Sequence, residues 1–513
     1  MGRGSSAAIA RLAASLLLGA ATVFGFAPFG YSALPVLTLA GLFGLWRGAA
    51  SPRAAAALGF AFGLGLFGAG VSWIYIALAR FGGMEGALAL VATALFCAYL
   101  ALFPAVSGWV TARLGRSGSG ERLGIAAACW SLAEWLRMWL FSGFPWLSVG
   151  YAQTRGPLAG YAPLGGVFLV SLAVAASAAL LAYAAAALRA PRRSGAVLAA
   201  AALAIVWIVG AGLRSIEWSR PAGAPISVSL VQGNIEQQLK FDPKYRDDTL
   251  AVYADLVAQA RGRLIVLPES ALPMLADEVP AEYIARLRAT VAARRSNLLL
   301  GLFLFEPRGP GEDGDRYFNS VVSIGTAPTQ TYRKRHLVPF GETIPAKPVV
   351  GWLIRRVLRI PLADQTPGPA DQAPFDIAGE RVAVNICYED AFGSELRGQL
   401  PTATLLVNVT NDAWYGRSLA AEQHAQIAAM RAVETARPML RATNTGITSI
   451  IDHRGAEVSR LSWFTRGVLE GTIAGRTGAT PYVRFGDVVA VLAALALGGA
   501  CLASARRRSA PDA

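Results

Sequence analysis

Long apolar stretches alternate with short connections over the first 213 residues, and one more apolar stretch lies near the end of the chain. A helix needs about 20 mostly apolar residues to cross the hydrocarbon core of a bilayer. Eight stretches come near this length, at residues 7–25, 32–47, 54–79, 85–110, 123–142, 160–188, 194–213 and 487–505. The pattern predicts an α-helical membrane bundle of eight spans.

Basic residues mark every second connection between these stretches, and in membrane proteins the cytoplasmic connections carry the excess of Arg and Lys. The basic residues precede span one and follow spans two, four, six and eight: Arg3, Arg11, Arg47, Arg53, Arg113, Arg116, Arg122, Arg189, Arg192, Arg193 and Arg506–Arg508. The intervening connections are nearly uncharged. We therefore expect both termini in the cytoplasm and the long segment before the last span on the opposite side.

The first apolar stretch allows a second interpretation, because Arg residues before a short apolar run are also typical of a cleaved signal peptide. Removing this stretch would break the alternation of basic and uncharged connections. A retained membrane anchor is therefore the preferred interpretation.

The pattern changes between spans seven and eight, where short β-rich runs alternate with amphipathic segments. Strands are expected at 226–231, 264–267, 297–304, 320–324, 382–386, 404–409 and 448–451, and helices at 247–261, 281–295 and 420–437. This predicts an α/β domain inserted into the membrane bundle. The expected parts are the bundle (1–213), the α/β domain (214–486), the eighth span (487–505) and a cytoplasmic tail (506–513).

Composition supports a membrane protein and excludes several other classes. Only 16% of the 513 residues are charged, against about 25% in soluble proteins. The excess Arg behind the net charge of +14 sits between apolar runs, whereas a nucleic-acid-binding surface needs clustered basic residues on a folded face. We therefore expect no nucleic acid as a partner. With three His and four Cys and no metal-binding motif, a dedicated metal site is not expected either.

Three residues with reactive side chains stand at the ends of predicted strands. Glu269 follows the run 264–268, and Cys387, the only thiol of the α/β domain, follows 382–386. Lys334 is one of four Lys against 43 Arg, in a chain that otherwise uses Arg for positive charge. Taken singly, each residue also has an ordinary interpretation. Glu269 fits a solvated loop carboxylate, Cys387 an inert buried thiol, and Lys334 a basic surface loop.

Taken together, the three residues fit covalent catalysis. A thiol attacks an acyl carbon as the thiolate, so it needs a base and a positive neighbour. The Glu269 carboxylate would take the proton from Cys387, and the Lys334 ammonium would stabilise the oxyanion.

The α/β domain resembles the nitrilase (carbon–nitrogen hydrolase) superfamily, whose Glu-Lys-Cys triad matches these three residues. The whole chain is similar to the apolipoprotein N-acyltransferase family of the bacterial inner membrane. Four motifs carry this resemblance: Leu230–Ile235, His336–Glu342, Asn411–Gly416 and Ser142–Trp146. The resemblance implies an α-β-β-α sandwich located in the periplasm.

The resemblance also implies a ping-pong acyl transfer without a cofactor. Glu269 acts as base, and Cys387 forms a thioester with the sn-1 acyl chain of a phospholipid such as phosphatidylethanolamine. The α-amine of a diacylglyceryl-cysteine at the N-terminus of an apolipoprotein then attacks this thioester. Lys334 and the backbone N–H of Tyr388 would form the oxyanion hole.

Supporting roles follow from the same resemblance. Glu342 would position Lys334, while Tyr388 and Glu389 would shape the site beside the nucleophile. Trp414 resembles part of a mobile arm over the pocket, although it also fits a buried aromatic residue of the core.

Further aromatic residues are candidates for lipid contacts. Phe241 stands where the family has Trp after Leu-Lys, and either ring could pack on an acyl chain. Phe144 and Trp146 follow the fifth span on the periplasmic side, where aromatic residues suit the membrane interface.

Four other polar residues call for an interpretation. Glu134 and Arg137 lie in the fifth span at i, i+3 spacing. Charges inside the membrane often mark functional sites, but this pair also fits mutual neutralisation, which we favour. His424 and His453 are expected to be surface or capping residues.

Two rival functions remain. A membrane-tethered amidase of small amides would share the triad, but a single span would suffice to anchor it. If the protein were a transporter or a scaffold, its function would survive Cys387→Ala. The predicted spans hold few charged residues that could form a substrate pathway. Acyl length, head-group preference, acceptor preference, oligomeric state and the route of lipid entry are not encoded in a recognisable pattern.

Overall fold

The computed structural model describes residues 2–189, 193–307, 315–343 and 364–507. Within these ranges the chain forms two compact units. The helical unit comprises Met1–Trp73, Leu90–Glu217 and Arg484–Ala513, and the sheet unit comprises Ile74–Ala89 and Trp218–Val483. Of the predicted cytoplasmic tail, residues 508–513 lie outside the described residues.

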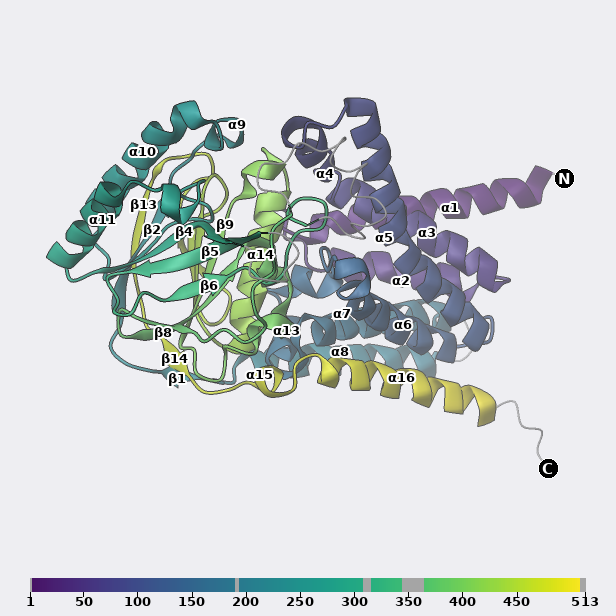
Figure 1. Ribbon diagram of the computed structural model, residues 1–513. Helices are drawn as coiled ribbons and strands as arrows, with labels where there is room; N and C mark the ends of the chain where they lie inside the picture. The colour runs from purple at the N-terminus through teal and green to yellow at the C-terminus, as the bar shows by residue number, and fades with distance from the viewer. Residues whose placement is uncertain (1, 190–192, 308–314, 344–363, 508–513) are drawn as a thin grey trace. The chain divides into compact units, whose positions relative to one another are not determined.

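Each of the eight predicted spans contains a helix (Figure 1). These helices are α1 (Gly2–Thr22), α2 (Leu34–Arg47), α3 (Pro52–Gly70), α5 (Gly86–Leu114), α6 (Glu121–Arg137), α7 (Ala162–Ala187), α8 (Ser194–Arg214) and α16 (Val488–Arg507). Among the described residues, six helical segments are long and apolar enough to cross a membrane. The other two predicted spans correspond to the shorter helices α2 and α6, of 14 and 17 residues.

The third predicted span is wrong in its extent. The apolar run 54–79 does not form one helix, because α3 ends at Gly70. The short helix α4 (Ile74–Ile76) and a π-helical turn, Ala77–Phe81, follow it, and both belong to the sheet unit. The run 54–79 contains no charged residue that would mark this break.

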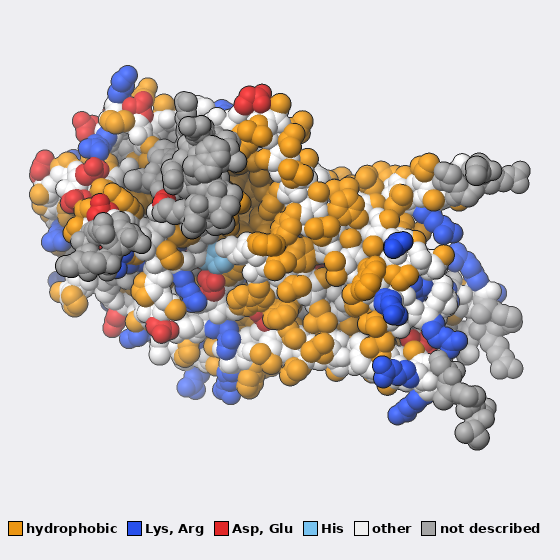
Figure 2. All heavy atoms as spheres, turned by 45° about the vertical axis from the view of Figure 1, so that its right-hand side comes forward, with side chains coloured by type: hydrophobic (Ala, Val, Ile, Leu, Met, Phe, Trp, Pro, Cys, Tyr) orange, Lys and Arg blue, Asp and Glu red, His pale blue; other side chains and the backbone are white. Residues whose placement is uncertain are grey.

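Large apolar side chains lie exposed on several of these helices. On the face that Figure 2 shows, hydrophobic side chains gather over the helical unit. The exposed residues include Leu90, Val91, Leu95 and Leu102 on α5, Val197, Leu198, Ile205 and Ile208 on α8, and Leu492 and Leu495 on α16. Exposed apolar surface of this extent is typical of a membrane-embedded protein.

The sheet unit contains two six-stranded sheets. One has the order β12 (Glu457–Arg460), β11 (Ser449–Ile451), β10 (Met439–Thr443), β9 (Leu405–Thr410), β8 (Glu380–Ile386) and β7 (Phe375–Ile377). The other has the order β13 (Gly467–Ile473), β2 (Ile226–Gln232), β3 (Leu264–Val266), β4 (Asn297–Glu306), β5 (Arg316–Ile324) and β6 (Thr331–Arg333). A separate two-stranded ribbon pairs β1 (Arg220–Pro221) with β14 (Arg476–Thr477).

The central strands of both sheets run parallel, so their carboxyl ends share an edge. Strands β8, β9 and β10 are parallel neighbours, as are β2, β3 and β4. The sheets face each other through contacts between β10 and β2 and between β5 and β8. Ligand sites in such folds form at the carboxyl ends of parallel strands.

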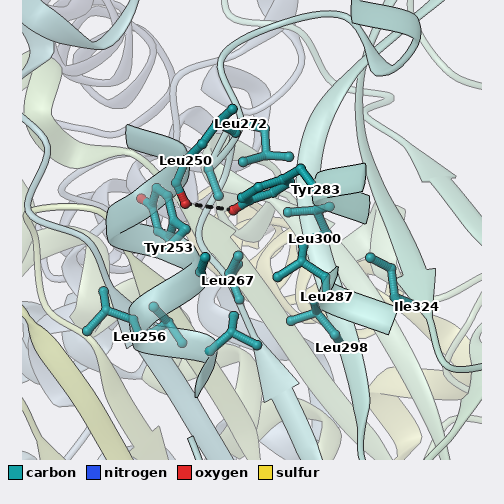
Figure 3. Packing of buried hydrophobic residues seen from close by; sticks show 14 of the residues in the cluster. Leu250, Tyr253, Leu256, Leu267, Leu272, Tyr283, Leu287, Leu298, Leu300 and Ile324 are labelled. Atoms are coloured by element: carbon teal, nitrogen blue, oxygen red, sulfur yellow. Dashed lines mark hydrogen bonds between the residues drawn. The ribbon is translucent and has the colours of Figure 1, made fainter. Parts of the chain in front are cut away.

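Helices cover the outer face of each sheet, which completes an α-β-β-α sandwich. Helices α10 (Arg246–Gln259) and α11 (Ala281–Ala293) pack on the sheet of β2–β6, and α14 (Ala420–Thr435) packs on the other. Figure 3 shows the first of these cores, where the Tyr283 hydroxyl donates to the Leu250 carbonyl over 3.0 Å. All seven predicted strands and all three predicted helices of this domain are present, with ends shifted by a few residues.

Candidate active site

Glu269, Lys334 and Cys387 come together at strand ends of the sheet unit. Glu269 lies just beyond β3, Lys334 follows β6, and Cys387 follows β8. The Lys334 ammonium lies 3.3 Å from Glu269 Oε1, and both charges act on the Cys387 thiol. All three side chains are buried. The structure therefore brings together the three residues that the sequence singled out.

Cys387 occupies a sharp turn between β8 and the 3₁₀ turn Cys387–Ala391. Its φ is 54°, in the left-handed region that residues other than glycine rarely adopt. Asn408 Nδ2 donates a 3.1 Å hydrogen bond to the Cys387 carbonyl and helps to hold this conformation. Backbone strain of this kind is concentrated at functional sites.

The Cys387 thiol is protonated at rest. Burial raises its pKa well above the usual range, the Glu269 charge raises it further, and the Lys334 charge acts in the opposite direction. A thiol in this state needs a base before it can attack, and the adjacent Glu269 carboxylate can serve as that base.

Lys334 carries a fixed positive charge. Burial acts to lower its pKa, but the carboxylates of Glu342 and Glu269 outweigh burial and raise the pKa well above its usual value. Glu342 Oε1 lies 2.7 Å from the Lys334 ammonium, and Glu342 Oε2 accepts from the Val338 N–H over 2.9 Å. Glu342 thus holds Lys334 in place, as the predicted positioning role requires.

Asn319 is a part of the site that sequence reasoning missed. It lies buried on β5, and its Nδ2 donates to Glu269 Oε1 over 2.7 Å and to Glu342 Oε1 over 3.3 Å. It thereby orients both carboxylates that face Lys334. The local sequence offered little signal, because β5 also contains Arg316, Ser320 and Ser323.

Glu389 connects the lysine loop to the nucleophile turn. Its carboxylate accepts from the backbone N–H groups of Ile386, Arg335 and His336 at 2.7, 2.6 and 3.1 Å, and from the Tyr332 hydroxyl at 3.0 Å. Burial raises the pKa of Glu389 to about 7, although these backbone donors and Lys334 act to lower it. Its neighbour Tyr388 is also buried and packs edge-on against Phe392.

A buried network of charges lies behind the nucleophile turn. His424 Nε2 lies 2.9 Å from Asp390, and its Nδ1 lies 2.8 Å from Asp412. The Arg441 guanidinium contacts both carboxylates, at 3.1 and 3.0 Å. His424 Nε2 is also 3.3 Å from the Cys387 carbonyl.

The prediction that His424 is a surface or capping residue is wrong. Its side chain is almost fully buried, because Asp390 and Asp412 each bind one of its ring nitrogens inside the domain. His453 is partly exposed, which fits the surface position expected for it.

Two of the predicted lipid-contacting residues lie in the sheet unit. Trp414 belongs to the 3₁₀ turn Asp412–Tyr415 and packs edge-on against Phe81, with ring centroids 6.2 Å apart. It is partly exposed, so it is not a fully buried core residue. Phe241 is also partly exposed and lies 6.4 Å from the Phe303 ring.

Phe144 and Trp146 belong to the helical unit, where Arg137 holds their backbone. Arg137 Nη1 donates to the carbonyls of Phe144 and Trp146 over 2.8 and 2.5 Å. Glu134 Oε1 accepts from the Trp130 indole and from the Val149 N–H. The Phe144 ring is partly exposed, whereas the Trp146 ring is buried. The charged pair therefore organises the loop that carries these aromatic residues.

Comparison with known proteins matches two family models in succession along the chain. Residues 18–180 match the apolipoprotein N-acyltransferase N-terminal domain, and residues 227–482 match carbon-nitrogen hydrolase. An apolipoprotein N-acyltransferase from Nitrosomonas europaea is 51% identical, covering 97% of this chain and 98% of the relative. One from Methylococcus capsulatus is 43% identical, covering 95% of this chain and 94% of the relative. Among solved structures, a carbon-nitrogen hydrolase from Helicobacter pylori has 17% identity and a TM-score of 0.35, covering 49% of this chain and 89% of that one.

Proposed function

Because the chain belongs to the apolipoprotein N-acyltransferase family, we propose that it acts through a thioester on Cys387, taking an acyl chain from a phospholipid. The protein is an acyltransferase of lipoprotein maturation and a membrane protein with several spanning helices. The proposal adds the donor, the acceptor atom and the residues that perform the transfer.

In the first half-reaction, Glu269 takes the proton from the Cys387 thiol. The thiolate attacks the carbonyl carbon of the sn-1 ester in a donor resembling phosphatidylethanolamine. The Lys334 ammonium and the Tyr388 backbone N–H stabilise the oxyanion. The ester C–O bond then breaks, and Glu269 returns its proton to the departing lysophospholipid oxygen.

In the second half-reaction, the neutral α-amine of a diacylglyceryl-cysteine attacks the thioester carbon. Glu269 takes a proton from the attacking nitrogen, the C–S bond breaks, and an amide forms. The proton then returns from Glu269 to the thiolate of Cys387. Neither half-reaction needs a cofactor or a metal ion.

In the proposed membrane topology, the chain crosses the membrane eight times and both termini lie in the cytoplasm. Its parts are the bundle over 1–213, a periplasmic catalytic domain over 214–486, the last span over 487–505 and a short tail over 506–513. Six long apolar helices among the described residues account for six of these spans, and α2 and α6 would supply the remaining two. Basic residues in alternate connections support the orientation in the inner membrane.

A membrane location suits two lipid substrates, since both can reach one site by lateral diffusion. Phe241, Trp414 and Phe144 are partly exposed aromatic side chains that can contact acyl chains. Trp146 is buried, so its role would be indirect: its ring packs edge-on against Trp73 within the helical unit and supports the loop that carries Phe144.

One observation carries the proposal: a buried thiol lies beside a carboxylate and a lysine that carries a fixed positive charge. The test is mass spectrometry of the purified protein and its Cys387→Ser variant after incubation with phosphatidylethanolamine alone. We expect a fatty-acyl mass increment on Cys387 of the unchanged chain, and its discharge when a diacylated lipopeptide with a free amine is added. Hydrolysis of small amides without any acyl adduct would instead establish an amidase.

A further inference from the structure

Two lysines lie buried in the sheet unit, and both contact Glu269. One is Lys334, and the other is Lys240 at the end of α9 (Gln237–Lys240), whose side chain is almost fully buried. Lys240 Nζ donates a 3.1 Å hydrogen bond to the backbone carbonyl of Glu269. In a chain with four Lys and 43 Arg, two buried ammonium groups that both bind Glu269, one at its carboxylate and one at its backbone carbonyl, call for an explanation.

Lys240 has far fewer partners than its charge requires. An ammonium group has three N–H donors, and within the described part of the chain Lys240 Nζ makes this one hydrogen bond and no ion pair within 4.0 Å. Lys334, by contrast, lies close to two carboxylates. Burying a charge without a close counterion costs free energy, so a negative charge that forms nearby during the reaction would stabilise protonated Lys240.

The chemistry of the site offers such a counterpart. Lys240 binds the backbone of Glu269, and Cys387 becomes a thiolate next to this residue once the Glu269 carboxylate has taken the thiol proton. Burial lowers the pKa of Lys240 to about 8, and the negative charges of Glu269 and Cys387 act in the opposite direction.

The charge balance of the site supports the same conclusion. Without Lys240, the carboxylates of Glu269 and Glu342 exceed the single ammonium of Lys334, and this excess negative charge opposes formation of a thiolate. With Lys240 protonated the four groups are neutral. Proton transfer from Cys387 to Glu269 then leaves the net charge of the site unchanged.

Other titratable groups also face the Cys387 thiol. The Asp412 charge acts on it, the Tyr415 hydroxyl interacts with it, and Glu389 interacts with Lys334. Asp412 is compensated by the buried network of His424 and Arg441. All of these groups remain in place when Lys240 alone is replaced, so a comparison of variants isolates its charge.

We propose that Lys240 is a second cationic residue of the active site, which stabilises the Cys387 thiolate by its charge and fixes the backbone of Glu269 by its hydrogen bond. It acts as a positioning and charge-balancing residue and keeps its own proton while the thiol proton moves to Glu269. This inference rests on the role of Cys387 as nucleophile proposed above.

The test measures the rate at which iodoacetamide alkylates Cys387 in the purified full-length protein between pH 6 and 10. The readout is the mass of the peptide that carries Cys387, so acyl transfer is not needed. Lys240→Met removes the charge and keeps the length, Lys240→Arg keeps the charge, and Lys244→Met is the control at an exposed lysine nearby. We expect Lys240→Met to slow alkylation at pH 8 by about tenfold or more and to move the rate profile to higher pH.

Lys240→Arg should stay within about threefold of the unchanged chain, and Lys244→Met should match it, because both retain the buried positive charge. An unchanged rate in Lys240→Met would overturn the inference. Equal slowing in Lys240→Met and Lys240→Arg would overturn it too, since the effect would then follow shape and not charge. If alkylation depends on Lys240 but no acyl adduct ever forms on Cys387, the inference stands and the proposed acyl transfer fails.

Discussion

The Lys334 ammonium lies 2.7 Å from Glu342 but 3.3 Å from Glu269. Glu342 thus takes the closer contact with the ammonium, whereas the closest donor to Glu269 Oε1 is Asn319 Nδ2, at 2.7 Å. Lys334 is therefore held mainly by the carboxylate that does not serve as base in the proposed mechanism.

Replacing Glu342 with Gln should therefore weaken the base. Lys334 would lose its closer counterion and pair more tightly with Glu269, which lowers the affinity of that carboxylate for the thiol proton. We expect kcat to fall by about 100-fold, at the lower end of the range attributed to general-base catalysis, with little change in KM. The measurement is steady-state acyl transfer to a diacylated lipopeptide, with Glu306→Gln as a control at a partly exposed carboxylate. Unchanged kcat would show that Glu342 has no part in tuning the base.

Glu389→Gln should cost both stability and activity. The carboxylate accepts from three backbone N–H groups and one hydroxyl, whereas an amide offers one acceptor oxygen and turns an N–H₂ group toward the other donors. Leaving a buried donor unsatisfied costs about 1–3 kcal/mol. We expect a lower unfolding temperature in detergent and a loss of activity, because the lysine loop is no longer fixed to the nucleophile turn.

Glu457→Gln serves as the matched control, since Glu457 pairs with Arg460 in a partly exposed position. It should leave both the unfolding temperature and the activity close to those of the unchanged chain. A fully active and fully stable Glu389→Gln variant would show that the connection through Glu389 is dispensable.

His424 should make stability depend on pH in the alkaline range. Burial and Arg441 act to lower its pKa, but Asp390 and Asp412 outweigh them and raise it from 6.5 to about 9. The folded protein then holds a proton that the unfolded chain releases. The resulting stabilisation is complete below about pH 6.5 and is lost as the pH rises through about 9.

Thermal unfolding of the detergent-solubilised protein between pH 6 and 10 tests this expectation. The unchanged chain should lose stability between pH 7 and 9.5, and His424→Asn should be less stable at pH 6.5 with a flatter dependence above it. Parallel pH profiles for the two proteins would mean that His424 is not the titrating group.

The grouping of Glu269, Lys334 and Cys387 was predictable from sequence because two of the residues end apolar strand patterns and the third stands out by composition. Glu269 and Cys387 each follow a buried parallel strand, and such strands bring their carboxyl ends to one edge. Lys334 was conspicuous because the chain otherwise uses Arg for positive charge.

The residues that sequence reasoning missed owe their positions to tertiary contacts. Strand β10 was not predicted, because Arg441 breaks its apolar run, and only the pairing of Arg441 with Asp390 and Asp412 makes that burial possible. The same network buries His424. The local sequence pattern does not reveal that Arg441 is buried, because its partners Asp412 and Asp390 lie 29 and 51 residues away along the chain.

Arg137→Lys should destabilise the helical unit even though it keeps the positive charge. The guanidinium donates to the carbonyls of Phe144 and Trp146 and to the Ser148 hydroxyl, while a lysine ammonium on a flexible stem cannot reproduce this planar fork. We expect a lower unfolding temperature and weaker phospholipid use, seen as a raised KM for the donor. Arg113→Lys, at an exposed position, is the control. Equal unfolding temperatures for the two variants would argue against this role of Arg137.

Trp414 and Phe81 should together limit hydrolysis of the acyl-enzyme. Their rings pack edge-on, with centroids 6.2 Å apart, and the turn that carries Trp414 begins at Asp412, whose charge acts on Cys387. A thioester at Cys387 survives only if water is excluded, so removing either ring should admit water to the site.

We therefore expect Trp414→Ala and Phe81→Ala each to raise the release of free fatty acid relative to acyl transfer. The double variant should add little, because the first truncation already breaks the shared contact. The measurement follows labelled fatty acid from the donor into free acid and into lipopeptide, with Phe305→Ala, whose ring packs against Tyr317, as the aromatic control. If the ratio of hydrolysis to transfer stays constant in all three single variants, the pair does not shield the thioester, and protection must come from the bound lipid itself.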